Sequence, residues 1–143
     1  MLGEQAKFPD SFTITQIFAT KSENNISGVV RKGEEKAWKF NDVVALMRIH
    51  EVLCNVAQFP QATHRLRQFN EEKEQRGLDA LKDLQTNDVL DQQPTFVVHI
   101  QYRQNASWQG TIQWVEENKE VRFRSALELI KLMDEAIEGD VWE

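Results

Sequence analysis

The chain of 143 residues lacks most of the features by which functions are recognised in a sequence. It has a single cysteine, Cys54, which excludes an intramolecular disulfide and a cysteine-based zinc cluster. No apolar run approaches the roughly 20 residues that a membrane-spanning helix needs, and the N-terminal stretch lacks the blocks of a signal peptide. A Gly-rich phosphate loop, an HExxH motif, a nucleophile elbow and a paired-cysteine motif are also missing. We therefore expect a cytoplasmic protein with no membrane segment and no catalytic residue that a motif identifies.

The composition is that of an ordinary globular chain with an acidic excess. Hydrophobic residues make up 41% of the sequence and charged residues 28%, so neither global disorder nor a membrane protein is indicated. The net charge is −6, and residues 94–143 supply most of it, with nine acidic groups against five basic ones. This charge disfavours binding to nucleic acid and favours a basic partner, although an acidic surface also serves solubility alone. No cofactor is predicted.

The stretch from 95 to 137 reads as a complete folding unit of three strands and a helix. Its first strand alternates as a strand half-buried against helices does, with one face formed by Phe96, Val98, Ile100 and Tyr102. The stretch from 12 to 53 repeats this apolar pattern with few identical residues, which indicates an internal duplication. There the corresponding strand face is expected to carry Phe12, Ile14, Gln16 and Phe18. Polar loops are predicted next, at Ala19–Asn25 and Arg103–Ser107.

Each unit continues with a second strand that contains a glycine, a short third strand and a capped helix. The matching positions of the second strands are Ile26, Gly28 and Val30 with Trp108, Gly110 and Ile112. A glycine inside a strand indicates a bulge or close packing beneath a large neighbour. The third strands are predicted at 37–40 and 120–123. The helices, at 43–53 and 126–137, begin after Asp42 and Ser125, and Glu128 completes a capping box with Ser125.

The polar stretch between the two units is expected to be partly helical. Apolar spacing predicts one helix from about 61 to 74 and another from about 77 to 85, and 88–94 resembles a flexible joint. The predicted fold class is α+β, with tandem β-β-β-α units related by a pseudo-twofold axis and an antiparallel sheet packed on helices. One such unit is marginal alone, so the two are expected to pair, in one sheet or in two. The predicted domains are a first repeat at 1–55, a linker at 56–94, and a second repeat with an acidic tail at 95–143.

Two sequence blocks in the second unit carry a family resemblance. Residues 102–110 read YRQNASWQG and residues 123–130 read FRSALELI. In these blocks the stretch 95–137 resembles a group of short bacterial proteins to which no activity is attached. The resemblance therefore implies no catalytic residue. The first unit departs from both blocks, so any binding role of the blocks would belong to the second unit alone.

The polar groups that folding leaves unexplained lie between residues 99 and 108. The loop combines a cation, amides and a large aromatic, a combination typical of recognition surfaces. Its tryptophan also fits a core position, because it shares a strand face with Gly110 and Ile112. The polar strand face before the loop would form a pocket or a solvated sheet surface. The predicted binding residues are His99, Gln101, Arg103, Gln104, Asn105 and Trp108.

His50 and Cys54 are the remaining residues with metal-binding chemistry. They lie four positions apart on one predicted helix face, a spacing that two metal ligands can share. No third ligand is apparent nearby, so we expect a buried thiol beside a helix histidine and predict no metal site.

The sequence leaves three functions open. The leading hypothesis is a non-catalytic protein–protein interaction or self-association module, with a protein partner or a homodimer, because the helices have wide apolar faces and the sheet has exposed edges. The alternative is a small-molecule-binding protein or a small enzyme that uses the 99–108 region. A third hypothesis is an acidic inhibitor of a nucleic-acid-binding protein.

Overall fold

The computed structural model describes residues 14–33, 36–57, 69, 77–87 and 92–138. The fold is α+β, as predicted. The described strands are β1 (Ile14–Ser22), β2 (Asn25–Lys32), β3 (Lys36–Phe40), β4 (Gln85–Thr86), β5 (Phe96–Tyr102), β6 (Gln109–Trp114) and β7 (Lys119–Phe123). The described helices are α2 (Val43–Ala57), α4 (Ala126–Glu138) and the 3-10 helix η1 (Gly77–Leu84).

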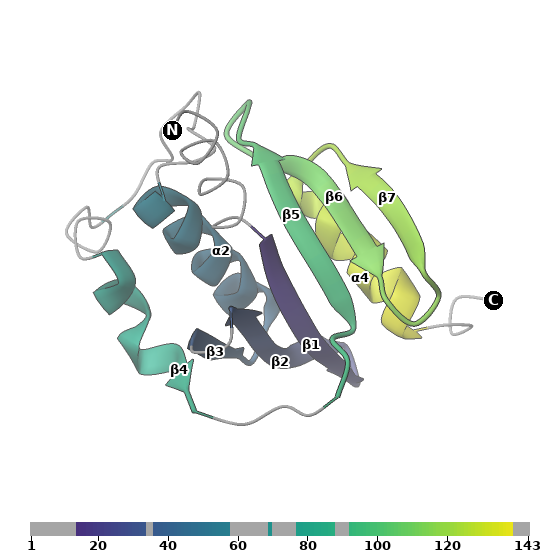
Figure 1. Cartoon of the computed structure of the whole chain (residues 1–143), viewed down its shortest axis with the longest axis horizontal. Coiled ribbons are helices and arrows are strands. Elements are labelled where there is room, and N and C mark those ends of the chain that lie inside the picture. The colour runs from purple at the N-terminus through teal and green to yellow at the C-terminus, as the bar shows by residue number, and fades with distance from the viewer. Residues whose placement is uncertain (1–13, 34–35, 58–68, 70–76, 88–91, 139–143) are drawn as a thin grey trace.

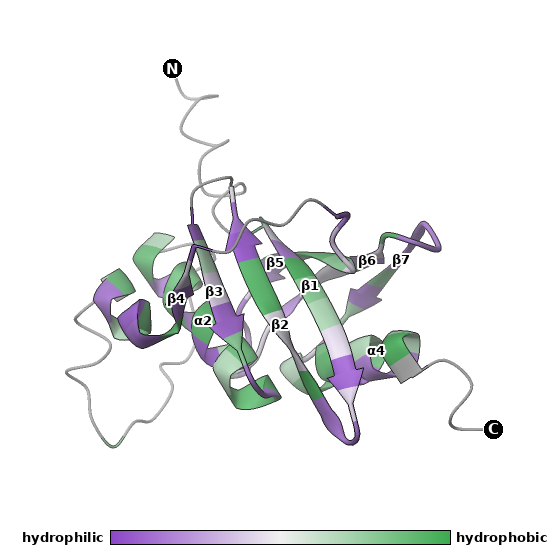
Figure 2. Ribbon diagram, turned by 90° about the horizontal axis from the view of Figure 1, so that it is seen from below, coloured by the Kyte–Doolittle hydropathy of each residue, from purple (hydrophilic) through white to green (hydrophobic). Residues whose placement is uncertain are grey.

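All the described strands belong to one antiparallel sheet, in the order β4-β3-β2-β1-β5-β6-β7 (Figure 1). The two groups of three strands join where β1 pairs with β5, with Gln16 opposite Val97. Both α2 and α4 lie on the same face of the sheet (Figure 2). The open choice between one sheet and two is thus settled as one sheet. None of the described helices is long and apolar enough to cross a membrane.

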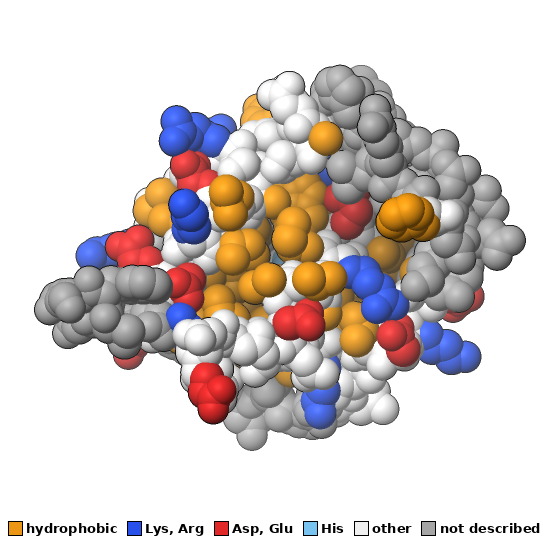
Figure 3. Space-filling view, turned by 180° about the vertical axis from the view of Figure 1, so that it is seen from behind, with side chains coloured by type: hydrophobic (Ala, Val, Ile, Leu, Met, Phe, Trp, Pro, Cys, Tyr) orange, Lys and Arg blue, Asp and Glu red, His pale blue; other side chains and the backbone are white. Residues whose placement is uncertain are grey.

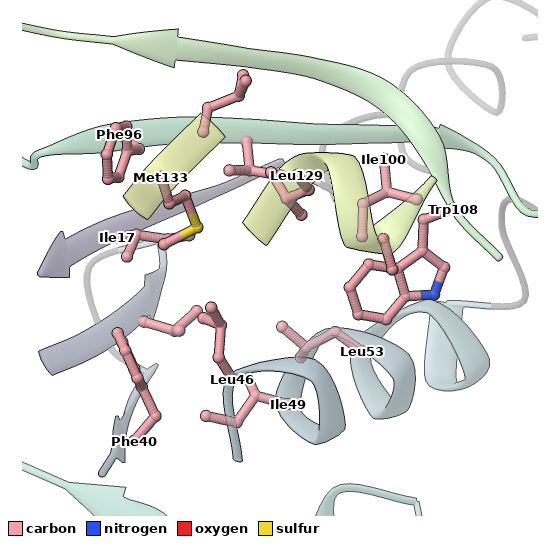
Figure 4. Packing of buried hydrophobic residues seen from close by; sticks show 14 of the residues in the cluster. Ile17, Phe40, Leu46, Ile49, Leu53, Phe96, Ile100, Trp108, Leu129 and Met133 are labelled. Atoms are coloured by element: carbon pink, nitrogen blue, oxygen red, sulfur yellow. The ribbon is translucent and has the colours of Figure 1, made fainter. Parts of the chain in front are cut away.

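The core lies between this sheet and the two helices (Figure 4). Strand alternation places one set of side chains toward the helices, and α2 and α4 contribute residues at helical spacing. The largest fully buried side chains include Phe40, Phe96, Phe123, Ile17, Leu46, Ile49, Leu129 and Met133. Both predicted helices contribute apolar residues to this core, among them Leu46, Leu53, Leu129 and Met133.

The prediction matched the wrong face of β1 to the helix-facing side of β5. Ile17 is completely buried in the main core, whereas Phe18 lies on the other sheet face with Val29 and Ala37, and Ile14 is 38% exposed. The helix-facing series of β1 is therefore the one that contains Thr15, Ile17 and Ala19. A shift of one residue turns a whole strand over, because side chains alternate with a period of two. Phe12 lies outside the described residues.

The predicted loop Ala19–Asn25 is also shorter than expected. Strands β1 and β2 continue pairing up to Ser22 and Asn25, and a two-residue turn joins them. Glu23 in that turn adopts a φ of 57°. Polar residues at the tip of a hairpin still hydrogen-bond through their backbone, so polarity alone did not mark the ends of the strands.

The helix caps agree with the sequence in one respect and differ in another. The Asp42 carboxylate accepts from Ala45 N–H at 2.9 Å, and the Ser125 hydroxyl accepts from Glu128 N–H at 3.1 Å. Glu128 does not close the predicted capping box, because its carboxylate accepts from Arg124 N–H at 2.8 Å. Arg124 adds an ion pair with the same carboxylate at 2.9 Å.

The predicted helix at 77–85 appears as η1, which packs on α2 and buries Leu81 completely. After it comes β4, a two-residue strand that the sequence did not predict and that pairs with Ala37 and Trp38 of β3. Arg48 on α2 fixes η1 through an ion pair with Asp83 at 2.8 Å. The predicted helix at 61–74 lies, apart from Phe69, outside the described residues.

The strand glycines lie at the same register position in both halves of the sheet. Gly28 pairs with Phe40, and Gly110 pairs with Phe123. Both phenylalanines are 1% exposed. A Cβ atom at Gly28 would lie 1.8 Å from the Phe18 carbonyl oxygen, and one at Gly110 would lie 1.9 Å from that of His99. The close approach of a neighbouring strand's backbone is thus what requires glycine at both sites.

Candidate functional site

The predicted binding loop sends two of its side chains into the protein interior, where they meet Glu51 of α2. The Trp108 indole N–H donates to Glu51 Oε1 at 2.7 Å, and Arg103 Nη1 donates to Glu51 Oε2 at 3.1 Å. Arg103 also donates to Asn55 Oδ1 at 2.7 Å. Both loop residues are only 5% exposed. Their polar atoms are thus engaged within the fold, and Trp108 takes the core position that the sequence left open.

A β-bulge explains how Arg103 reaches the helix side of the sheet. The register between β5 and β6 shifts between Ile100 and Tyr102. Ile100 faces the core, and strict alternation would place Arg103 on the opposite face. An extra residue in a strand re-aims the side chains that follow it. The bulge next to Gly110 is therefore the feature that brings Arg103 to Glu51.

His50 extends this buried polar cluster toward β1. Its Nδ1 donates to the Leu46 carbonyl oxygen at 2.9 Å, and its Nε2 lies 2.7 Å from Thr15 Oγ1. In a neutral imidazole with Nδ1 protonated, Nε2 accepts a hydrogen bond from the Thr15 hydroxyl. The imidazole also contacts the Trp108 ring, with the ring centroids 6.0 Å apart. Both ring nitrogens are thus engaged within the core.

Cys54 lies beside this cluster as a buried thiol. It is 1% exposed, and burial raises the pKa of the thiol to about 12. A metal ligand or nucleophile needs the thiolate, which this environment disfavours. The geometry therefore supports the interpretation of His50 and Cys54 as packed core residues.

The buried His50 leads to a prediction of pH-dependent stability. Burial lowers the pKa of His50 from 6.5 to about 4. Because the folded-state pKa is the lower one, protons bind the unfolded chain more strongly, and stability is lost as pH falls from about 6.5 toward 4. The expected loss attributable to His50 is about 2 kcal/mol between pH 7.5 and pH 5.

Urea unfolding of the wild type and of His50→Gln at both pH values measures this effect. Glutamine keeps hydrogen-bonding groups but does not titrate, so the carboxylates remain as a common background. The wild type should lose about 2 kcal/mol more stability than the variant on acidification. Equal losses in the two proteins would contradict a buried neutral imidazole.

The other predicted loop residues stay at the surface. Gln104 and Asn105 are exposed, and Asn105 and Ala106 both have a φ of 57°. The side chain of Gln109 closes the loop, since it accepts from Gln104 N–H at 2.9 Å and donates to Gln104 O at 3.0 Å. These contacts hold the shape of the loop, with Gln104 and Asn105 at its exposed tip.

The sheet separates His99 and Gln101 from the cluster around Glu51. They extend from β5 on the face opposite Phe96, Val98 and Ile100, as the alternation predicted. Within the part of the chain that the structure describes, His99 Nε2 and Gln101 Oε1 are buried without a hydrogen-bond partner. The six predicted residues therefore do not converge on one site. Two lie in the interior, two at the loop surface and two on the outer sheet face.

Sequence reasoning missed an apolar hollow between β5, β6, β7 and α4. Its volume is about 150 Å3. Val121, one of its lining residues, is 45% exposed. No local pattern in the sequence marked it, because its lining residues come from three strands and a helix that meet only in the folded sheet. The apolar lining is formed by Phe96, Ile112, Trp114, Val121, Leu132 and Ala136, with Lys119 and Glu135 as the charged members.

Comparison with family models, curated proteins and solved structures finds no match to this chain.

Proposed function

We propose that the protein is a non-catalytic module for protein–protein interaction or self-association. The observation that carries this proposal is the apolar hollow beside β7, which forms one edge of the sheet. Apolar hollows with exposed hydrophobic residues at a sheet edge are the kind of surface that a protein partner covers. Val121 lines this hollow and forms part of the exposed edge.

The helical side of the molecule adds further apolar surface. Figure 3 shows hydrophobic side chains gathered in the middle of this side. Val44 on α2 is 72% exposed, and Leu127 on α4 is 64% exposed. Each is the second residue of its helix. Both belong to the wide apolar faces that the sequence predicted for the two helices. Wide apolar arcs favour contacts beyond the sheet that each helix already covers.

The polar side chains of the 103–108 loop bond mainly within the fold, which supports a binding role over a catalytic one. A catalytic site needs nucleophilic or titratable groups that converge on a space open to substrate. Here Arg103 and Trp108 both donate hydrogen bonds to Glu51 in the interior. The hollow, by contrast, has only Lys119 and Glu135 as charged lining residues. Its chemistry suits an apolar side chain of a partner.

We also propose that the chain arose by tandem duplication of a β-β-β-α unit, with a pseudo-twofold axis near the Gln16–Val97 pair. The equivalent pairings Gly28–Phe40 and Gly110–Phe123 support this proposal. They require Ile17, rather than a residue of the Phe18 series, to be equivalent to Val98, because Ile17 pairs with Val30 and Val98 with Ile112. On this proposal, the resemblance of 95–137 to short bacterial proteins concerns the second unit.

The test of the proposed function is light scattering coupled to size exclusion, over a series of protein concentrations. We expect a mass twice that of the chain, or a defined complex with a second protein. Val121→Asp should abolish either association, because it places a carboxylate against the apolar hollow. A wild-type chain that stays monomeric and retains no partner would overturn the proposal.

Val44→Asp is the matched control for this experiment. Val44 is even more exposed than Val121, and it lies in the first turn of α2, where an acidic side chain is favourable to the helix. Because the hollow carries the proposal and the helix side only adds apolar surface, Val44→Asp should weaken association far less than Val121→Asp does. Loss of association in Val44→Asp but not in Val121→Asp would move the binding surface from the hollow to the helices.

A further inference from the structure

The two edges of the described sheet differ in what they offer to another strand. One edge is β4, which has only two residues. The other is β7, with five residues, of which the first four are exposed. An exposed edge strand presents unpaired backbone groups that invite another strand. Of the described strands, β7 is thus the better template for pairing with a further chain.

We propose that β7 pairs antiparallel with β7 of a second copy of this chain, with Val121 facing Val121. This inference rests on the proposed function and names the partner for it. The two sheets would become continuous across a twofold axis that passes through the Val121 pair. Pairing of this kind adds main-chain hydrogen bonds, while the side chains decide which register is accepted.

Charge complementarity selects this register. In a continuous antiparallel sheet, residues directly opposite each other point to the same face. A twofold axis between the two β7 strands must therefore pass between the two copies of one residue. With Val121 at the centre, Glu120 of each copy faces Arg122 of the other. With Glu120 at the centre, two glutamates face each other, and with Arg122 at the centre, two arginines do. Opposite charges across strands stabilise pairing and like charges oppose it, and of these three registers only the one centred on Val121 has no like-charge pair within β7.

The charges that this register pairs are available. No ion pair or side-chain hydrogen bond engages Glu120 or Arg122 within the described residues. Across β6 they face Gln113 and Thr111, which are neutral. Charged residues on an edge strand protect it from arbitrary strands. The same residues here permit one partner, an identical strand in the complementary register.

The apolar hollow gives the pairing a second contact on the helix side of the sheet. Val121 lines the hollow and is half-exposed at its margin. In the proposed dimer, the Val121 side chains cover each other, and the two hollows adjoin across the axis. The strand Lys119–Phe123 thus brings its charged and its apolar face to the same partner.

The experiment compares four full-length proteins by sedimentation velocity: wild type, Glu120→Arg, Arg122→Glu and the double variant. Either single variant turns both cross-strand pairs into like-charge pairs, and should weaken the dimer by about tenfold or more. The double variant restores both attractive pairs with their signs exchanged, and should dimerise like the wild type. An equimolar mixture of the two single variants should form the heterodimer, because arginines of one then face glutamates of the other.

Glu117→Arg, in the exposed turn before β7, is the control with the same change of net charge as Glu120→Arg, and it should leave the dimer intact. Circular dichroism melts confirm that every variant folds. If the wild type dimerises and the single variants dimerise equally well, β7 pairing is wrong while self-association stands. If the wild type is monomeric at every concentration, β7 pairing is also wrong, whatever other protein the hollow binds. Restoration in the mixture supports the register directly.

Discussion

Replacing Gly110 by alanine is expected to destabilise the protein by more than about 4 kcal/mol, which places it among the most damaging single substitutions. The added Cβ would lie 1.9 Å from the carbonyl oxygen of His99 and 3.1 Å from the Gln101 backbone nitrogen. Real Cβ atoms do not approach a carbonyl this closely, so β5 and β6 must separate locally. That separation would disturb the bulge that directs Arg103 to Glu51. Urea unfolding followed by tryptophan fluorescence measures the loss.

Gly28→Ala should have a similar effect, and Gly33→Ala provides the control. At Gly28 the Cβ would lie 1.8 Å from the Phe18 carbonyl oxygen. Gly33 has a φ of 68°, and among the described residues, its chain neighbours aside, no atom lies within 4 Å of its Cβ position, so alanine there meets a strained backbone. Its cost should be about 1 kcal/mol. Equal effects at Gly33 and Gly110 would show that backbone conformation, rather than the approach of β5, sets the requirement for glycine.

The sequence predicts the order of elements well because local signals mark them. Alternating apolar residues identified β5, and capping residues before an apolar stripe identified α2 and α4. The same reasoning failed at β1, where both faces carry large apolar residues. Phe18 is 4% exposed on the outer face, beneath the guanidinium of Arg31 at 4.9 Å from its ring. Two apolar faces leave the phase of a strand open, and only its pairing with β2 and β5 decides it.

The candidate site was less predictable than the fold because its side chains depend on contacts distant in the sequence. Arg103 and Trp108 resemble a recognition surface when the loop is read alone. Their partner, Glu51, lies on a helix 52 and 57 residues earlier, and nothing in its local pattern marks it as an acceptor for both. A one-residue bulge further changes the face on which Arg103 lies. The hollow beside β7 similarly arises from elements that meet only in the folded sheet.

Glu51→Ala tests whether the Arg103–Trp108 cluster is a structural element, and we expect it to cost about 3–5 kcal/mol. The substitution removes the acceptor of the Trp108 indole and the ion-pair partner of Arg103, whose side chain is only 5% exposed. A buried guanidinium without its carboxylate keeps its desolvation penalty and loses the compensating attraction. Glu116→Ala in the exposed turn between β6 and β7 is the control, and it should change stability by less than about 0.5 kcal/mol.

The double variant Glu51→Leu with Arg103→Met separates the two roles that the cluster could have. If the ion pair serves only to neutralise two buried groups, apolar residues of similar volume should recover most of the stability lost in Glu51→Ala, because neither charge remains to be desolvated. Asn55 would then lose its Arg103 donor but stays partly exposed to water. If the double variant is as unstable as the single one, the charges hold the 104–108 loop in place by geometry that packing cannot replace. In that case, the cluster's contribution would be conformational specificity of the loop in addition to stability.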